Sequence, residues 1–66
     1  MQITVNGEAK TVDEGLSLRS LIEHLGLGQA AVAAEVNKSL IPRRDHESTS
    51  LSDGDTVELV TLVGGG

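Results

Sequence analysis

The sequence predicts an α+β fold in which one helix packs across one face of a mixed sheet of four to five strands. Three observations favour it: an Asn-Gly dipeptide between two short alternating runs, one apolar stripe with helical spacing, and further alternating runs after that stripe. No internal repeat or linker divides the 66 residues. We therefore expect a single domain over residues 1–66, with a flexible C-terminal tail at residues 64–66.

The first 12 residues predict a β-hairpin with strands at about 2–6 and 8–12. Ile3 and Val5 share one face of the first alternating run. Asn6 and Gly7 separate the two runs, and both residue types tolerate the positive φ that a type I′ turn requires. The turn therefore sets the pairing of the two strands.

One apolar stripe predicts the helix, with residues at i, i+3, i+4 and i+7: Leu18, Leu21, Ile22 and Leu25. Ser17 is a suitable N-cap, and Leu16 before it is placed to pack back on the stripe. Gly26 is expected to end the helix in the left-handed conformation, with Leu27 folding back toward Ile22.

The second half of the chain alternates again and predicts three more strand segments. Val32, Ala34 and Val36 share a face, and a turn near Asn37-Lys38 leads to a short run through Leu40 and Ile41 that Pro42 ends. The stretch RRDHESTS is polar and is expected to be a loop. Asp53-Gly54-Asp55 forms a tight turn before the final strand.

The final strand is apolar on both faces, with Val57, Leu59 and Val63 on one side and Val60 and Leu62 on the other. A strand of this kind is usually central in its sheet. Because only one helix is available to cover the sheet, Val60 and Leu62 are expected to form an exposed patch for a partner.

Composition excludes several functions. The chain has no cysteine, so it has no disulfide, no thiolate zinc site and no thiol nucleophile, and a cytoplasmic setting fits. No apolar stretch is long enough to span a membrane. Ten acidic residues stand against five basic ones, giving a net charge of -5, and no aromatic ring is present to stack on bases. Nucleic acid is therefore not an expected partner. A protein with a basic surface is the expected kind of partner instead.

No residue set predicts catalysis or metal binding. Asp53, Asp55 and Glu58 lack the ligand spacing of a calcium loop. His24 is placed near a helix C-terminus, where the helix dipole explains it. His46 is in the polar loop and is expected to be solvated. Neither histidine has a serine or cysteine nucleophile in a recognisable context, so a catalytic triad has no support.

Arg43-Arg44 is the only basic cluster in the sequence. A pair of this kind is most often solvated surface. The functional interpretation is that Arg43 and Arg44 orient a partner complex electrostatically.

The tail, Gly64, Gly65 and Gly66, has two interpretations. It is either a frayed terminus or cloning remnant, or a functional arm. Three extended residues reach roughly 10 Å beyond the sheet. A stretch without side chains can thread a narrow channel, and the carboxylate of Gly66 becomes an acyl donor once ATP converts it to an acyl-adenylate.

Several features together resemble the ubiquitin-like β-grasp sulfur carriers, in particular those of thiamine biosynthesis. These are the ββαββ order, the segment VNKSLIPRR, the run LSDGDTVELVTLVGGG and the Gly-Gly ending. The resemblance covers essentially the whole chain. It implies a β-grasp fold and makes the functional arm the favoured interpretation of the tail.

The resemblance also implies that the protein is a co-substrate and not an enzyme, and that the chain binds no cofactor itself. An E1-like, ThiF-type adenylating enzyme would use ATP to adenylate Gly66, and sulfur from a cysteine desulfurase would convert it to a thiocarboxylate for thiazole synthase. Gly64 and Gly65 would thread into the partner's active site, and Val60 and Leu62 would lie in the docking face. A monomer with transient partners is expected.

Three alternatives remain. The small subunit of molybdopterin synthase also ends in Gly-Gly, but it is usually longer and forms a stable complex with a large partner. A ubiquitin-like modifier would pass the same activated carboxyl to a lysine. An interaction domain with an incidental tail would keep its function without Gly65 and Gly66.

Overall fold

The computed structural model describes residues 1–62 and begins with the expected hairpin. Strands β1 (Gln2–Val5) and β2 (Glu8–Thr11) pair antiparallel. Asn6 and Gly7 have φ values of 50° and 83°, so both residues of the turn adopt the positive φ that the dipeptide predicts. The strands are each one residue shorter than predicted at their C-terminal ends, because Asn6 belongs to the turn and Val12 follows β2.

Helix α1 (Leu18–His24) has the predicted caps at both ends. The Ser17 hydroxyl accepts a hydrogen bond from the Ser20 N–H at 3.0 Å. Gly26 has φ 77°, and the N–H of Leu27 donates to the Ile22 carbonyl at 3.0 Å. This is the Schellman arrangement, which satisfies carbonyls that the end of the helix leaves without partners.

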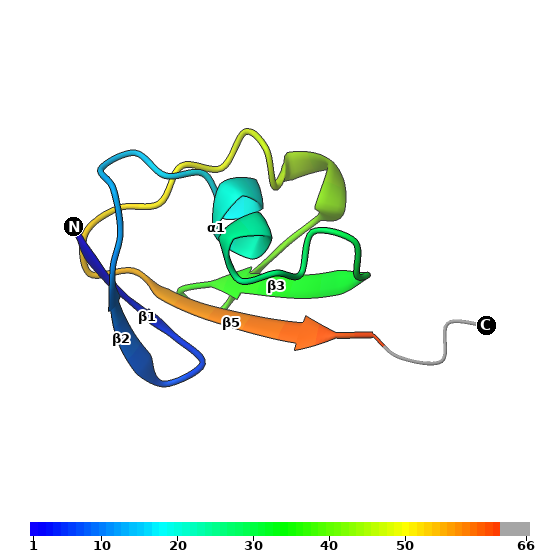
Figure 1. The fold of residues 1–66 in the computed structure, drawn as a ribbon, viewed down its shortest axis with the longest axis horizontal. Coiled ribbons are helices and arrows are strands. Elements are labelled where there is room, and N and C mark those ends of the chain that lie inside the picture. The colour runs from blue at the N-terminus through cyan, green and yellow to red at the C-terminus, as the bar shows by residue number, and fades with distance from the viewer. Residues whose placement is uncertain (63–66) are drawn as a thin grey trace.

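The remaining elements are β3 (Val32–Val36), β4 (Ser39–Ile41), a 3₁₀ turn η1 (Arg43–Asp45) and β5 (Thr56–Thr61). β3 and β4 form a second hairpin, whose turn residues Asn37 and Lys38 have φ values of 52° and 71°. The sheet order is β2-β1-β5-β3-β4, and only the β1–β5 pairing is parallel. Helix α1 lies across one face of this sheet (Figure 1). The predicted fold class, a mixed sheet with one main helix on one face, is confirmed with five strands.

Strand β5 is central, as the apolar character of both its faces predicts. Its inner residues Val57 and Leu59 are buried under α1. They belong to a single aliphatic core: Ile3, Val5, Leu18, Leu21, Ile22, Ala34, Leu51, Val57 and Leu59. The predicted position of Val63 on the inner face lies outside the described residues. Within residues 1–62, no helix is long and apolar enough to cross a membrane.

The prediction that His46 is solvated is wrong. Its side chain is only 4% exposed, although its sequence neighbours are polar. The segment does not run as an open loop, because η1 turns it back over the sheet and brings the His46 ring within 3.0 Å of the Ile41 carbonyl. The His46 carbonyl also accepts from the Arg19 N–H of α1 at 3.0 Å, so both the ring and the backbone are held.

Candidate functional site

Strand β5 carries the chain toward the glycines, and hydrogen bonds along its length hold it in place. The N–H of Leu59 donates to the Asn6 side chain at 2.8 Å, a contact across 53 positions of sequence. The N–H of Leu62 donates to the Ala31 carbonyl at 2.8 Å. In Figure 1 the C-terminal end of β5 points away from the β1–β2 hairpin, toward one end of the molecule. The base of the tail is therefore anchored in the middle of the sheet.

Asn37 fixes the other end of β5. Its side-chain oxygen accepts from the Thr56 N–H at 2.9 Å, and its amide donates to Asp55 at 2.9 Å. Asp55 also accepts from the Ser52 N–H, and Asp53 accepts from the Gln2 N–H at 2.7 Å. The two carboxylates of the Asp-Gly-Asp turn thus serve as internal acceptors.

Three large apolar side chains are exposed on the sheet face opposite α1. Val60 is 58% exposed, Leu62 57% and Leu40 67%. Val60 lies opposite Ala33 in the β3–β5 pairing. Val60 and Leu62 are therefore both accessible, and they lie next to the point where β5 ends. Leu40 was not singled out from the sequence, although its alternation with the half-buried Ile41 places it on this outer face.

The outer face also carries acidic groups. Glu35 and Glu58 are directly opposite each other in the β3–β5 register, and Leu40 is opposite Glu35 on the other side. Like charges at opposed positions are unfavourable, and neither carboxylate forms an ion pair with the described residues. We call Ala33, Glu35, Leu40, Glu58, Val60 and Leu62 the outer face.

Arg43 and Arg44 begin the 3₁₀ turn η1 and are exposed. Because η1 lies on the same side of the sheet as α1, the structure does not bring them together with Val60 and Leu62 (Figure 1). Arg43 instead lines a pocket with Arg19 and Ile22 of α1. The two candidate interface regions are thus on different sides of the sheet.

The other candidate residues form no catalytic arrangement in residues 1–62. His24 is the last residue of α1, and its ring Nδ1 is 2.7 Å from the Ser20 carbonyl oxygen. The described residues contain no group of acidic and histidine side chains suited to a metal ion. Gly64, Gly65 and Gly66 lie outside the described residues.

Comparison with known proteins identifies the group to which the sequence is related. Residues 3–66 match the family model described as "ThiS family". The chain belongs to the ThiS family. The match extends through the three glycines at the C-terminal end of the sequence.

Solved structures and curated relatives agree with this family. The crystal structure of the ThiS protein from Geobacter metallireducens is 39% identical and superposes with a TM-score of 0.84, with 100% of both chains covered. The sulfur carrier protein ThiS of Escherichia coli K12 is 32% identical over 66 residues, again covering 100% of both chains. The resemblance to the β-grasp carriers is thereby confirmed.

Other relatives are longer proteins named thiazole synthase. The thiazole synthase of Magnetococcus marinus is 35% identical over 66 residues. These residues are the whole of this chain but only 20% of that protein's length. The ThiS-like region is thus found both as a small protein and as part of a longer one.

Proposed function

We propose that this chain is the sulfur carrier of thiamine biosynthesis, with sulfur carried as a thiocarboxylate at Gly66 and delivered to thiazole synthase. The carrier catalyses nothing itself and acts as the co-substrate of enzymes that handle its tail. The observation that carries this proposal is the family match, which extends through the glycines to Gly66.

The proposed chemistry has two steps. First, a carboxylate oxygen of Gly66 attacks the α-phosphorus of ATP, and pyrophosphate leaves to give a glycyl adenylate. Second, a hydrosulfide equivalent attacks the acyl carbon, AMP leaves, and the carboxyl carbon keeps one oxygen and one sulfur. An E1-like adenylating enzyme supplies the site for the first step. A cysteine desulfurase supplies the sulfur for the second step as an enzyme-bound persulfide, from which a second thiol displaces the hydrosulfide equivalent and is itself oxidised to a disulfide.

The composition supports carriage at the carboxyl group. The 66 residues include no cysteine, so the chain has no thiol on which sulfur could be held as a persulfide. Gly64 and Gly65 have no side chains and can pass through a channel that excludes other residues. Thiazole synthase as the acceptor is supported by relatives of that name that contain a ThiS-like region.

The outer face is the proposed docking surface for the adenylating enzyme. Its two apolar side chains nearest the end of β5, Val60 and Leu62, are more than half exposed. Because each is already partly buried, burying the rest against a partner would contribute about 1–2 kcal/mol each. The opposed pair Glu35 and Glu58 favours a partner with a basic surface at that point.

Intact-mass measurement tests the proposal. The carrier is incubated with its adenylating enzyme, ATP and sulfide. We expect a mass gain equal to the difference between one sulfur and one oxygen atom. Controls without ATP, and a variant lacking Gly65 and Gly66, should show no gain. An unchanged mass with an enzyme that is active on another carrier would refute the proposal.

A further inference from the structure

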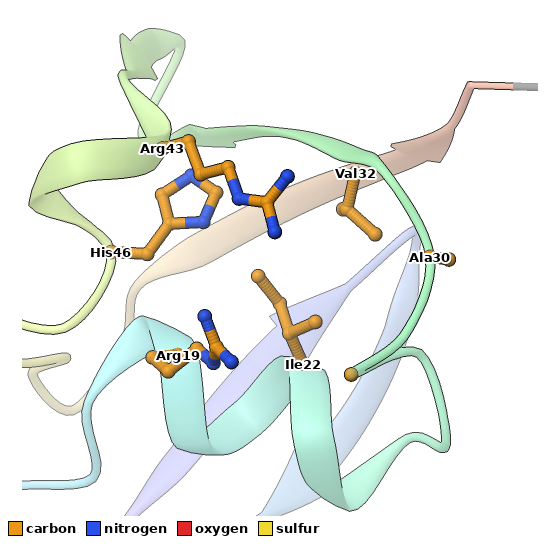
Figure 2. Close-up of a pocket in the computed structure, with 7 residues that line it drawn as sticks. Arg19, Ile22, Ala30, Val32, Arg43 and His46 are labelled. Atoms are coloured by element: carbon orange, nitrogen blue, oxygen red, sulfur yellow. The ribbon is translucent and has the colours of Figure 1, made fainter. Parts of the chain in front are cut away.

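A small pocket lies on the helix side of the sheet, between α1, the segment that precedes β3, and η1. Figure 2 shows the side chains that line it. Its volume is about 20 Å³, and it is open to solvent on one side. A water molecule needs about 10–15 Å³ by the same kind of measure, so the pocket suits one small group rather than a nucleotide or a sugar.

The pocket concentrates positive charge in an acidic protein. Two of the five basic residues of the chain, Arg19 and Arg43, turn their guanidinium groups into it from α1 and η1 (Figure 2). Arg19 forms an ion pair with Glu23 through Nε at 3.3 Å. Arg43 makes no ion pair with any residue in 1–62. The two cations therefore face one cavity, and among the described residues only Arg19 is paired with a carboxylate.

His46 provides a third polar group, and its orientation follows from its hydrogen bond. A carbonyl oxygen only accepts, so Nε2 must carry the proton that is donated to Ile41 at 3.0 Å. Nδ1 has no hydrogen-bond partner among the described residues, and because those residues contain no buried side-chain nitrogen or oxygen without a partner, Nδ1 must itself reach solvent although His46 is only 4% exposed. Figure 2 shows this part of the ring turned toward the pocket. With the proton on Nε2, Nδ1 is an acceptor and cannot pair with an anion, so the groups that can donate to an anionic ligand in this pocket are the two guanidinium groups.

The side of the pocket opposite His46 is lined by the apolar side chains of Ile22 and Val32, whereas the Ala30 side chain points away from it (Figure 2). A ligand that matches both walls has a short aliphatic stem and a small planar anionic head. The guanidinium fork pairs with carboxylates in a bidentate manner, and aspartate and glutamate side chains have the required stem. We propose that this pocket binds the carboxylate side chain of an aspartate or glutamate on the adenylating enzyme.

The position of the pocket identifies the partner, and this step rests on the proposed function. Ala30 and Val32 flank Ala31, whose carbonyl accepts from the N–H of Leu62 at the end of β5. The pocket is therefore beside the base of the tail. An enzyme that docks on the outer face and draws Gly66 into its active site must also extend around this end of the carrier to reach the helix side, and an acidic side chain there would fix how the carrier docks.

The first test uses sodium propionate, a free carboxylate with a short stem, and does not depend on the proposed function. Amide shifts of the full chain are followed by NMR, with sodium chloride at equal ionic strength as the reference. We expect saturable shifts at Ala30, Val32 and His46. Arg43→Gln should weaken propionate binding about tenfold or more, while Arg44→Gln, the matched loss of one charge outside the pocket, should not.

Shifts that do not saturate, or that are equal with chloride, would overturn the carboxylate site. The same conclusion follows if Arg43→Gln and Arg44→Gln behave alike. Binding that appears only after residues 63–66 are removed would identify the chain's own carboxylate as the occupant and would also overturn the proposal.

The second test measures thiocarboxylate formation by the adenylating enzyme at a series of carrier concentrations. Arg43→Gln should raise the KM for the carrier about tenfold with little change in kcat, and Arg44→Gln should have a much smaller effect. If wild type forms the thiocarboxylate and Arg43→Gln has an unchanged KM, the partner's carboxylate is excluded and the proposed function stands. If wild type forms none, the propionate test still decides the pocket.

Discussion

Asn6 shows how one residue connects distant parts of this fold. Its φ of 50° places it in the left-handed region, and its side-chain oxygen accepts from the Leu59 N–H at 2.8 Å. The same residue therefore closes the first hairpin and holds the central strand that leads to the tail. Asparagine suits both tasks because it tolerates positive φ and has a short polar side chain.

Replacing Asn6 can separate its hydrogen bond to the Leu59 N–H from its role in the hairpin turn. Asn6→Gly keeps the turn conformation but leaves the part-buried Leu59 N–H without its acceptor, so we expect the free energy of unfolding to fall by roughly 1–3 kcal/mol. Asn6→Asp retains an acceptor and should stay close to wild type. Urea denaturation measures both variants. Equal stability of Asn6→Gly and wild type would show that the hydrogen bond contributes nothing.

The burial of His46 cannot be predicted from the residues next to it in the sequence. The sequence places it among Arg, Asp, Glu and Ser residues, and on that basis it was predicted to be solvated. Its burial depends on the path of the backbone through η1 and on a carbonyl five residues earlier, at Ile41. Neither leaves a periodic signal in the sequence. The pocket beside His46 also leaves no signal in the sequence. Arg19 and Arg43 are 24 positions apart in the sequence, and they line the same pocket only because α1 and η1 pack against each other.

At the level of elements, predictions from local signals succeeded. The Asn-Gly turn, the Ser17 cap and the Gly26 terminus each depend on the chemistry of a few adjacent residues, and each is found where the sequence places it. The 3₁₀ turn η1 has no such signal apart from Pro42, and the bridge between Ser17 and Ser50 joins segments 33 positions apart (50 − 17). Elements specified by tertiary contacts were therefore not predicted.

The helix terminus provides a test at this scale. A Cβ added at Gly26 would meet no atom within 4 Å, so the cost of Gly26→Ala comes only from the φ of 77°. We expect a loss of about 1–2 kcal/mol in the free energy of unfolding. Gly26→Asn, which tolerates this conformation better, should lose less. Thermal or urea denaturation distinguishes them, and an alanine variant as stable as wild type would contradict the strain.

At the scale of the whole molecule, one helix cannot cover two faces of a five-stranded sheet. The inner face is filled by the core, and the outer face keeps Leu40, Val60 and Leu62 exposed. An exposed apolar face is predicted from β5 alone, because a central strand with apolar residues on both faces needs packing partners on both sides and the chain has only one helix. The participation of Leu40 was not predicted, because it depends on the position of β4 at the sheet edge.

The outer face can be tested without unfolding the protein. The double variant Val60→Ser, Leu62→Ser removes apolar surface next to the base of the tail, and we expect kcat/KM for thiocarboxylate formation to fall about tenfold or more. Leu40→Ser makes the same kind of change on the edge strand β4 and should have a smaller effect. Both proteins should remain folded by circular dichroism. An undiminished kcat/KM in the double variant would exclude this face as the docking surface.

Fragmentation mass spectrometry of the reacted carrier tests whether the proposed sulfur is carried on Gly66. The extra mass of one sulfur in place of one oxygen should be found only in fragments that contain Gly66, and it should disappear when thiazole synthase and its small-molecule substrates are added. Extra mass on any other residue would show that sulfur is not carried on Gly66, and a thiocarboxylate that thiazole synthase leaves unchanged would show that this enzyme is not its acceptor.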